Sequence, residues 1–393
     1  MSTRRSFLAR AAIGAAISAA VGTPLAAAAQ SAAIAAPPFP RLEGALVLSG
    51  GGARGAYEAG VVEAMVRAAG IGEHVALPGV DLVCGSSIGT LNGWFVASGQ
   101  YAQLREMWAT IGTDDLFEIK HRFRAIAEPS SGVGTRIFEA VMLERGLSSD
   151  VQGVLDGHRV EAWIRRHVDV TTPLLVPLVF TVTSLARQTG VIYYRLPPYA
   201  STDARASAVA AIHGTVGPDV DVREADDAVL REAIRASAAI PLLFDAVTLR
   251  GPDGVDDAFI DGGIADNTPV DVARALAKRV RVIIVDPREI PPKKYPSGIS
   301  VGFAAFGIAQ RRVTESALRA AVIESESKRM LAATTPQAAA FRDGLYDVDI
   351  ATVRPQHVLP ADVPDFDRQE LIDATVAAGR ADGARGFIPY RLR

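Results

Sequence analysis

A serine that lies between two glycines is a candidate for a chemically reactive group in this chain. Residues Gly85 to Gly89 read Gly-Ser-Ser-Ile-Gly, after the apolar residues 82–84 and before apolar residues at helical spacing. A strand, a tight turn and a helix in this order are typical of a nucleophile elbow, which presents a serine hydroxyl at the edge of a sheet. The pattern predicts Ser87 as a nucleophile. An ordinary strand-to-helix turn with a capping serine is the alternative that the pentapeptide leaves open.

A second glycine-rich turn lies upstream. The hexapeptide Gly50-Gly51-Gly52-Ala53-Arg54-Gly55 follows the apolar residues 45–48 and precedes a helical pattern, so its backbone N–H groups could face an anion. A dinucleotide site would place an acidic residue about 20 positions on, at a strand end. Glu73 has that distance but lies in a loop-like stretch. The other interpretation is an oxyanion hole for an ester carbonyl, formed by Gly50, Gly51 and Gly52 together with Arg54. Arg54 would hold this loop, face a phosphate or remain a surface charge.

An aspartate supplies the candidate base. The apolar residues 258–260 end at Asp261-Gly262-Gly263, and in open α/β sheets the working groups lie where strands leave the sheet. An Asx turn that only stabilises the corner is the structural alternative for Asp261. A triad in the order Ser, Asp, His would need a histidine after Asp261, and only His357 meets that condition.

Strands and helices must position these groups. The Pro- and Gly-rich residues 197–227 are expected to form a long surface loop or lid. Strands are expected at 45–48, 82–84, 174–185, 191–194, 258–260, 280–285 and 347–353. Helices are expected after both glycine turns, over 230–240 before Pro241, after 266–269, and at 301–309, 314–332 and 368–378.

The composition is that of a globular protein able to bury a sizeable core, with 49% hydrophobic and 22% charged residues. A net charge of −3 argues against a nucleic-acid binder. The single cysteine, Cys84, excludes an internal disulfide framework, and its apolar surroundings suggest a buried thiol. The six histidines are scattered, without zinc-like spacing.

The first 36 residues are not expected to join the fold. Residues 2–8 contain a twin-arginine pattern at Arg4 and Arg5, followed by an Ala-rich stretch and small residues that suit cleavage. They resemble a bacterial twin-arginine export signal, which indicates a periplasmic or extracellular protein. A membrane anchor is the alternative, although alanine is weakly hydrophobic and Pro24 interrupts the stretch.

Four motifs together resemble the patatin-like phospholipase family. They are the Gly50–Gly55 loop, the Gly85–Gly89 elbow, the run Arg235-Ala236-Ser237-Ala238-Ala239-Ile240-Pro241, and Asp261-Gly262-Gly263 followed by Asn267-Thr268-Pro269. The resemblance covers about 42–286. Residues 110–170 and 197–227 carry no motif of the family, so substrate selectivity is least transferable there.

The resemblance implies an α/β fold, a three-layer sandwich with a mainly parallel central sheet and helices on both faces. Residues 41–290 would form the catalytic core, and 291–393 would complete the same domain with helices, a strand and a last helix. It also implies an acyl-ester hydrolase with a Ser87–Asp261 dyad, no histidine, and no metal or organic cofactor.

The expected partner is a lipid or another acyl ester. Peripheral membrane contact is an additional expectation, because basic clusters at 120–124 and 165–167 could meet anionic head groups, although a solvated face explains them as well. A carboxylesterase acting on short acyl chains would use the same dyad. A non-catalytic nucleotide-binding protein that uses the glycine loop is the rival from another class.

Overall fold

A computed structural model describes residues 41–112 and 153–392, except 154, 156, 242, 252, 291–297 and 335–344. The expected export segment (1–36) and the basic cluster at 120–124 lie outside these residues. No helix in the described ranges is both long and apolar enough to cross a bilayer.

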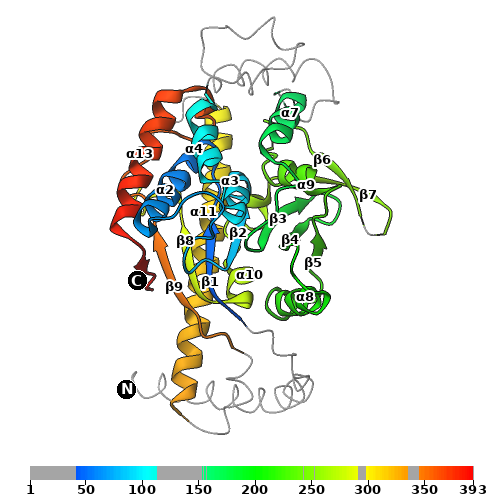
Figure 1. Ribbon diagram of the computed structural model, residues 1–393, viewed down its shortest axis with the longest axis vertical. Helices are drawn as coiled ribbons and strands as arrows, with labels where there is room; N and C mark the ends of the chain where they lie inside the picture. The colour runs from blue at the N-terminus through cyan, green and yellow to red at the C-terminus, as the bar shows by residue number, and fades with distance from the viewer. Residues whose placement is uncertain are drawn as a thin grey trace, which may run out of the picture.

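One mixed, mainly parallel sheet organises the molecule (Figure 1). Its strands are β1 (Leu42–Leu48), β2 (Leu82–Ser86), β3 (Leu178–Ser184), β4 (Thr189–Arg195), β5 (Asp221–Glu224), β6 (Val247–Arg250), β7 (Asp256–Ile260), β8 (Ala277–Ile283), β9 (Asp349–Val353) and β10 (Ile388–Pro389). The main path runs β10-β9-β8-β1-β2-β3-β4-β5, and the β6–β7 hairpin joins it through β3. The strands β9, β8, β1, β2 and β3 are parallel to one another, whereas β7 pairs with β3 in the antiparallel sense.

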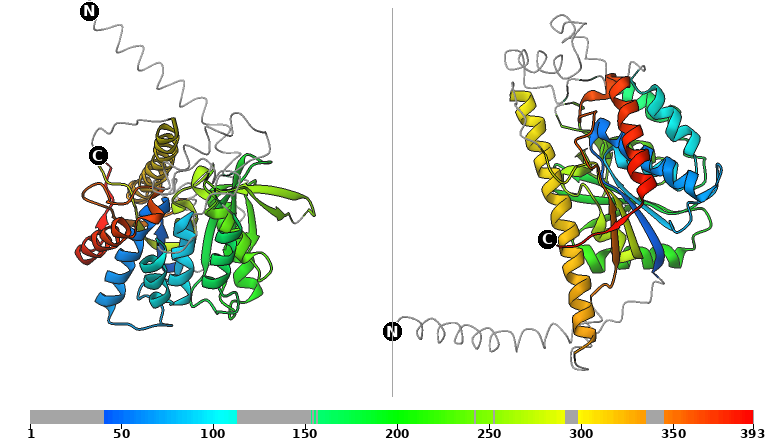
Figure 2. Two further views of the ribbon diagram at one scale, coloured as in Figure 1. Left: turned by 90° about the horizontal axis from the view of Figure 1, so that it is seen from above. Right: turned by 90° about the vertical axis from the view of Figure 1, so that its left-hand side faces the viewer.

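Helices cover both faces of the sheet and make a three-layer α/β sandwich, as expected (Figure 2). They are α2 (Ala56–Ala69), α3 (Ile88–Ser98), α4 (Tyr101–Thr110), α7 (Gly157–His167), α8 (Thr202–Val216), α9 (Leu230–Ser237), α10 (Val270–Leu276), α11 (Gly298–Ala332) and α13 (Gln369–Arg385). Three short 3-10 turns, η1 (Gly52–Gly55), η3 (Gly262–Ile264) and η5 (Asp365–Asp367), lie between the longer elements of the described chain.

Alternation along the strands divides the core into two layers. In β1, Leu46 and Leu48 face the layer that holds residues of α2, α3, α4 and α13, while Ala45 and Val47 face α10 and α11. Every residue from Ala45 to Leu48 is almost fully buried, as expected for a parallel strand covered on both faces. The sheet is therefore a rigid support, and its carboxyl edge can hold side chains in fixed positions.

Two expectations about elements were wrong. Residues 197–227 are not one long loop, since they contain α8 and β5. The Ser201 hydroxyl accepts a hydrogen bond from the Ala204 N–H (3.2 Å) and so caps an alanine-rich helix. The stretches 301–309 and 314–332 are one continuous helix, α11, because the residues between them include three good helix formers (Gln310, Arg311 and Arg312) and no proline.

Candidate active site

Ser87 lies at the tip of a sharp turn between β2 and α3. Its backbone has φ 54° and ψ −135°, a conformation that a residue with a side chain adopts only when its surroundings hold it. The Thr90 N–H donates to the Ser87 carbonyl (2.9 Å) and closes the turn. A Cβ on Gly85 would lie 2.6 Å from the Gly89 carbonyl oxygen, so the turn also needs its flanking glycines. The strand, turn and helix that the sequence predicts are present.

Asp261 reaches the same point from a distant part of the chain. It follows β7, and its Oδ2 atom accepts a 2.5 Å hydrogen bond from the Ser87 hydroxyl. Its Oδ1 atom accepts from the Gly263 N–H (2.8 Å). The two interpretations of this aspartate are therefore compatible, since one oxygen makes the Asx-type turn and the other faces the serine.

The segment 235–241 holds both members of this pair. The Ser237 hydroxyl accepts the Ser87 N–H (3.0 Å), and the carbonyl oxygen of Ala239 accepts the Asp261 N–H (2.9 Å). Ser237 uses its single proton toward the Thr181 carbonyl (2.7 Å), so the Thr90 hydroxyl must donate to Ser237 in their 2.8 Å contact. Each of these buried N–H and hydroxyl donors therefore has an acceptor, and the hydrogen bonds hold the elbow against β3 and α9.

The glycine loop lies beside the elbow, but its three N–H groups are not equivalent. Gly50, Gly51 and Gly52 all have positive φ (62°, 143° and 61°), which glycine adopts readily. The Gly50 N–H donates to a carboxylate oxygen of Glu58 (3.1 Å). Within the described part of the chain, the N–H groups of Gly51 and Gly52 donate to no acceptor. These two donors remain for an external anion.

Glu58 is a buried carboxylate that the sequence interpretation passed over. Besides Gly50, it accepts a hydrogen bond from Asn92 Nδ2 (2.9 Å), and Asn92 Oδ1 in turn accepts from the Trp108 indole (2.9 Å). Glu58 is fully buried, and burial raises its pKa to about 7 despite these donors. The sequence could have indicated this buried carboxylate, because Glu58 shares the inward face of a helix with Val61 and Val62.

Arg54 supports the loop from the other side. Its guanidinium donates to the Gly51 carbonyl (3.3 Å) and pairs with Asp286, which follows β8 (2.5 Å). The structure therefore differs from the prediction that counted Gly50 and Arg54 among the oxyanion-binding residues. The Gly50 N–H and the Arg54 guanidinium are occupied by buried carboxylates, which need donors in a low-dielectric interior.

The electrostatics of Asp261 suit a base better than those of an ordinary aspartate. Burial raises the pKa of Asp261 to about 7, while the hydrogen bonds from Ser87 and Gly263 act in the opposite direction. No cation pairs with Asp261 in the described residues. The carboxylate is therefore both accessible to the serine proton and unusually basic.

An apolar pocket of about 40 Å³ opens next to Ser87. Hydrophobic side chains from α3, α7 and α9 form most of its wall, and Gly52 and Ser87 provide the polar end. Its lining side chains include Leu91, Val160, Trp163, Ile164, Ile234, Ile240, Phe244 and Phe366. Helix α7 belongs to the region 110–170 where the sequence matched no motif.

Among the described residues, no alternative catalytic group meets Ser87. His357 is exposed after β9, and both carboxylate oxygens of Asp261 have other partners. Glu73 accepts the Ala102 N–H at the start of α4 (2.9 Å), so it does not occupy the strand end that a dinucleotide site would need. The described residues also contain no group of three or more His, Cys, Asp or Glu side chains that could hold a metal ion.

Several supporting residues could not have been found from motif spacing alone. Ser237 lies within a motif, but nothing in the sequence said that its hydroxyl meets the elbow. Asn92 and Thr90 are polar residues on a helix whose every residue is buried. A polar residue in such an apolar helix is the one sequence signal that would have singled them out.

A family profile and a solved structure are similar to this chain. A sequence profile described as patatin-like phospholipase matches residues 46–274, which include both Ser87 and Asp261. Among solved structures, the crystal structure of VipD from Legionella pneumophila is similar at 11% sequence identity and a TM-score of 0.34, over 89% of this chain and 68% of that chain. No curated protein matches the chain. Because the profile spans more than half of the sequence, the chain belongs to the patatin-like phospholipase family.

Proposed function

We propose that this protein is a lipid acyl hydrolase that cleaves carboxylic esters with a Ser87–Asp261 dyad. The observation that carries the proposal is the 2.5 Å hydrogen bond from the Ser87 hydroxyl to the buried Asp261 carboxylate. A nucleophile needs a base within hydrogen-bond reach, and this pair meets that condition without a third residue.

In the first half-reaction, Ser87 Oγ attacks the ester carbonyl carbon while its proton passes to Asp261 Oδ2. The carbonyl oxygen becomes an oxyanion, which is assigned to the N–H groups of Gly51 and Gly52 because neither has an acceptor within the described residues. Collapse of this intermediate breaks the ester bond. Asp261 then returns the proton to the departing alcohol, which leaves an acyl group on Ser87.

In the second half-reaction, water attacks the acyl-serine, and Asp261 takes a proton from that water. The same oxyanion donors act again, and the proton returns to Ser87 as the fatty acid leaves. A base with a pKa of about 7 suits both directions of transfer near neutral pH, whereas an ordinary aspartate would be a poor base there.

The pocket wall supports an acyl chain as the group that binds beside Ser87. Nearly all its lining side chains are hydrophobic, so an alkyl segment would displace water there at little polar cost. Phospholipid or lysophospholipid is therefore the preferred substrate class. The small volume of about 40 Å³ favours a second candidate, a carboxylesterase acting on short acyl esters.

The decisive test compares Ser87→Ala with Ser86→Ala. Ser87→Ala should abolish fatty-acid release from phosphatidylcholine micelles and labelling by a fluorophosphonate probe. Ser86 is buried and contacts the Thr181 hydroxyl (3.1 Å), so Ser86→Ala should keep most of both signals. Labelling that persists in Ser87→Ala would refute the assignment. Running short-chain esters in parallel separates the lipase from the esterase.

Export by a twin-arginine route remains part of the proposal. It is supported by the arginine pair and the Ala-rich stretch in the first 36 residues. It is also supported by the cysteine content, because the single cysteine, Cys84, is buried and the fold needs no disulfide. Fusing residues 1–40 to a reporter should deliver that reporter to the periplasm of a bacterial host. Replacing Arg4 and Arg5 by lysine should stop delivery, and export that continues unchanged would contradict the proposed route.

A further inference from the structure

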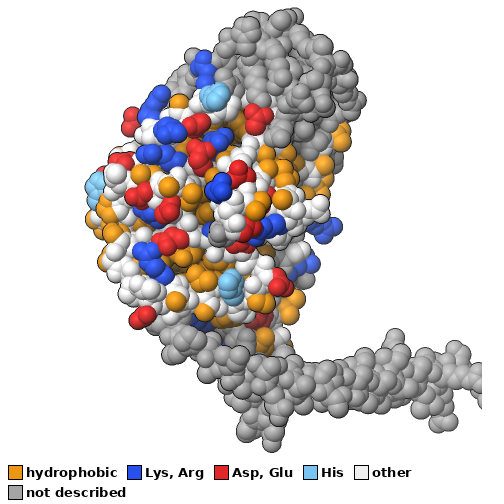
Figure 3. Space-filling view, turned by 90° about the vertical axis from the view of Figure 1, so that its right-hand side faces the viewer, with side chains coloured by type: hydrophobic (Ala, Val, Ile, Leu, Met, Phe, Trp, Pro, Cys, Tyr) orange, Lys and Arg blue, Asp and Glu red, His pale blue; other side chains and the backbone are white. Residues whose placement is uncertain are grey.

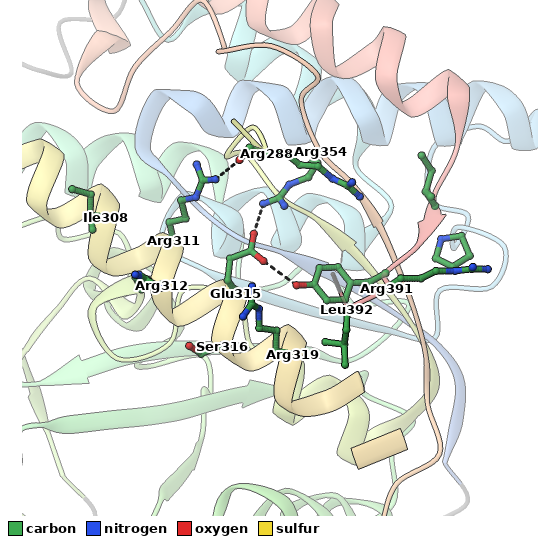
Figure 4. Close-up of a pocket in the computed structure, with 13 residues that line it drawn as sticks. Arg288, Ile308, Arg311, Arg312, Glu315, Ser316, Arg319, Arg354, Arg391 and Leu392 are labelled. Atoms are coloured by element: carbon green, nitrogen blue, oxygen red, sulfur yellow. Dashed lines mark hydrogen bonds and ion pairs between the residues drawn. The ribbon is translucent and has the colours of Figure 1, made fainter. Parts of the chain in front are cut away.

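A second concave site lies between α11, the segment after β9 and the C-terminal residues that follow β10 (Figure 4). The cleft has a volume of about 660 Å³. Its lining contains six arginines and one acid, Glu315; the arginines are Arg288, Arg311, Arg312, Arg319, Arg354 and Arg391. This excess of one sign is unusual in a chain whose net charge is −3.

Internal pairing accounts for only part of this charge. Glu315 is shared between Arg354 (2.8 Å) and the Tyr390 hydroxyl (2.9 Å). The guanidinium of Arg311 donates to the Arg288 carbonyl, which is uncharged. In the described part of the chain, no carboxylate forms an ion pair with Arg288, Arg312, Arg319 or Arg391. The cleft therefore holds cationic groups that its own acid does not neutralise.

The face of the molecule shown in Figure 3 has a different charge pattern. On the face shown in Figure 3, basic and acidic side chains alternate, with hydrophobic side chains between them. Exposed arginines outside the cleft commonly have an acidic partner, as Arg329 does with Asp347 and Asp349 (3.0 and 2.7 Å). Clustering like charges in a hollow is costly unless an anion relieves their repulsion.

We propose that this cleft binds a phosphate-type anion carrying at least two negative charges, held by Arg312, Arg319 and their neighbours. Planar guanidinium groups bind phosphate oxygens in pairs, and several of them around one cavity match a phosphomonoester or a pyrophosphate. The anion is either free in solution or the head group of a lipid, since both present the same oxygens. The site is separate from Ser87 and does not depend on the proposed hydrolysis.

A structural route connects the two sites. Arg354 donates to the carbonyl oxygen of Asp286 (3.1 Å), whose carboxylate pairs with Arg54 below the glycine loop. Arg354 also pairs with Glu315 in the cleft. An anion bound there would compete with Glu315 for the Arg354 guanidinium, which is part of this series of contacts. The cleft also lies beside the carboxyl edge of the sheet, since Arg288 follows β8 and Arg354 follows β9.

The test measures binding of inorganic pyrophosphate by calorimetry. The protein used is the Ser87→Ala variant, so that the proposed hydrolysis does not contribute to the measured heat. The double variant Arg312→Gln with Arg319→Gln removes two exposed guanidiniums and should weaken binding at least about tenfold. A matched control, Arg105→Gln with Arg250→Gln, removes the same charge from exposed positions outside the cleft and should bind within about twofold of the parent.

A second arm identifies the source of the anion. Flotation with phosphatidylcholine vesicles containing phosphatidic acid is compared with vesicles of phosphatidylcholine alone. Pyrophosphate binding that depends on Arg312 and Arg319 supports a soluble ligand, and vesicle binding with the same dependence supports a lipid head group. If the parent binds neither probe, or if the double variant binds as the parent does, the proposal is wrong. Either result leaves the Ser87 assignment unaffected.

Discussion

Asp261 is the residue on which the proposed chemistry depends most. A carboxylate buried without a cation would ordinarily be a cost to the fold. Here its two oxygens accept hydrogen bonds from Ser87 and Gly263, which offset part of that cost and leave a pKa of about 7. The same burial that would make Asp261 a competent base in the proposed reaction thus makes it a destabilising residue when it is charged.

This opposition predicts a pH-dependent effect of Asp261→Asn on stability. The folded pKa of about 7 lies above the unfolded value of about 3.9, so the folded state binds more protons between these values. The contribution of Asp261 to the wild-type free energy of unfolding is therefore present at low pH, and it is lost as the pH rises toward 7. The introduced asparagine cannot ionise, so the variant's advantage should grow by up to roughly 1.4 kcal/mol per pH unit in that interval.

Urea unfolding of both proteins between about pH 5 and about pH 8 checks this expectation. An asparagine can still accept from Gly263 and face the Ser87 hydroxyl, so the variant is expected to fold. Turnover should nevertheless be lost. A stability difference that stays constant across this range would mean that Asp261 is ionised throughout.

At the scale of elements, the glycine loop is held from two sides. Glu58 on α2 accepts the Gly50 N–H, and Arg54 holds the Gly51 carbonyl while pairing with Asp286 after β8. These contacts leave the N–H groups of Gly51 and Gly52 available for the oxyanion of the proposed reaction. A loop with positive φ at three successive glycines depends on such contacts for a single conformation.

Glu58→Gln should therefore reduce kcat more than it changes KM. The glutamine amide would face the Asn92 amide donor, so one hydrogen bond around the loop would be lost. The oxyanion donors would be less well placed, and kcat should fall by about tenfold to a hundredfold. Steady-state kinetics would measure this, with Glu106→Gln, an exposed acid on α4, as the control. Equal kcat values in both variants would show that Glu58 does not position the loop.

At the scale of the whole molecule, helix α13 near the C-terminus packs against helix α2 near the start of the described residues. Helices α2 and α13 cross so closely that a Cβ on Gly379 would lie 2.0 Å from the Tyr57 carbonyl oxygen. The Tyr57 hydroxyl donates to Asp382 (2.8 Å), also on α13. Residues 325 positions apart thus belong to one layer over the sheet (Figure 2). This layer carries α2, which in turn holds Glu58 under the glycine loop.

Gly379→Ala should consequently destabilise the fold. The methyl group would meet backbone atoms of α2, which cannot move aside without separating the two helices. We expect a loss of about 1 to 3 kcal/mol in thermal or urea unfolding. Gly307→Ala on α11 is the matched control, because no atom lies within 4 Å of its added Cβ. That control should be neutral or slightly stabilising through helix propensity. Similar results for both variants would argue against close packing at Gly379.

The sequence alone determined the local context of each key group. Alternating apolar runs and glycine turns predicted β1, β2, β7 and β8, and placed Ser87 and Asp261 directly after strands. These features follow from short-range constraints of backbone geometry and burial. The expectation failed over 197–227, where proline and glycine at the ends outweighed the helix-forming alanines between them. The second difference is α11, which the sequence pattern divides into two helices and which is continuous in the structure.

Only the tertiary structure decided which groups meet. Ser87 and Asp261 are 174 positions apart, and Asp261 arrives through an antiparallel hairpin on β3 rather than from a neighbouring parallel strand. The structure likewise assigned Gly50 and Arg54 to supporting the loop, because the buried partners Glu58 and Asp286 come from other elements. Strand order and the hydrogen-bond partners of buried polar side chains depend on contacts between distant parts of the chain, which no local pattern encodes.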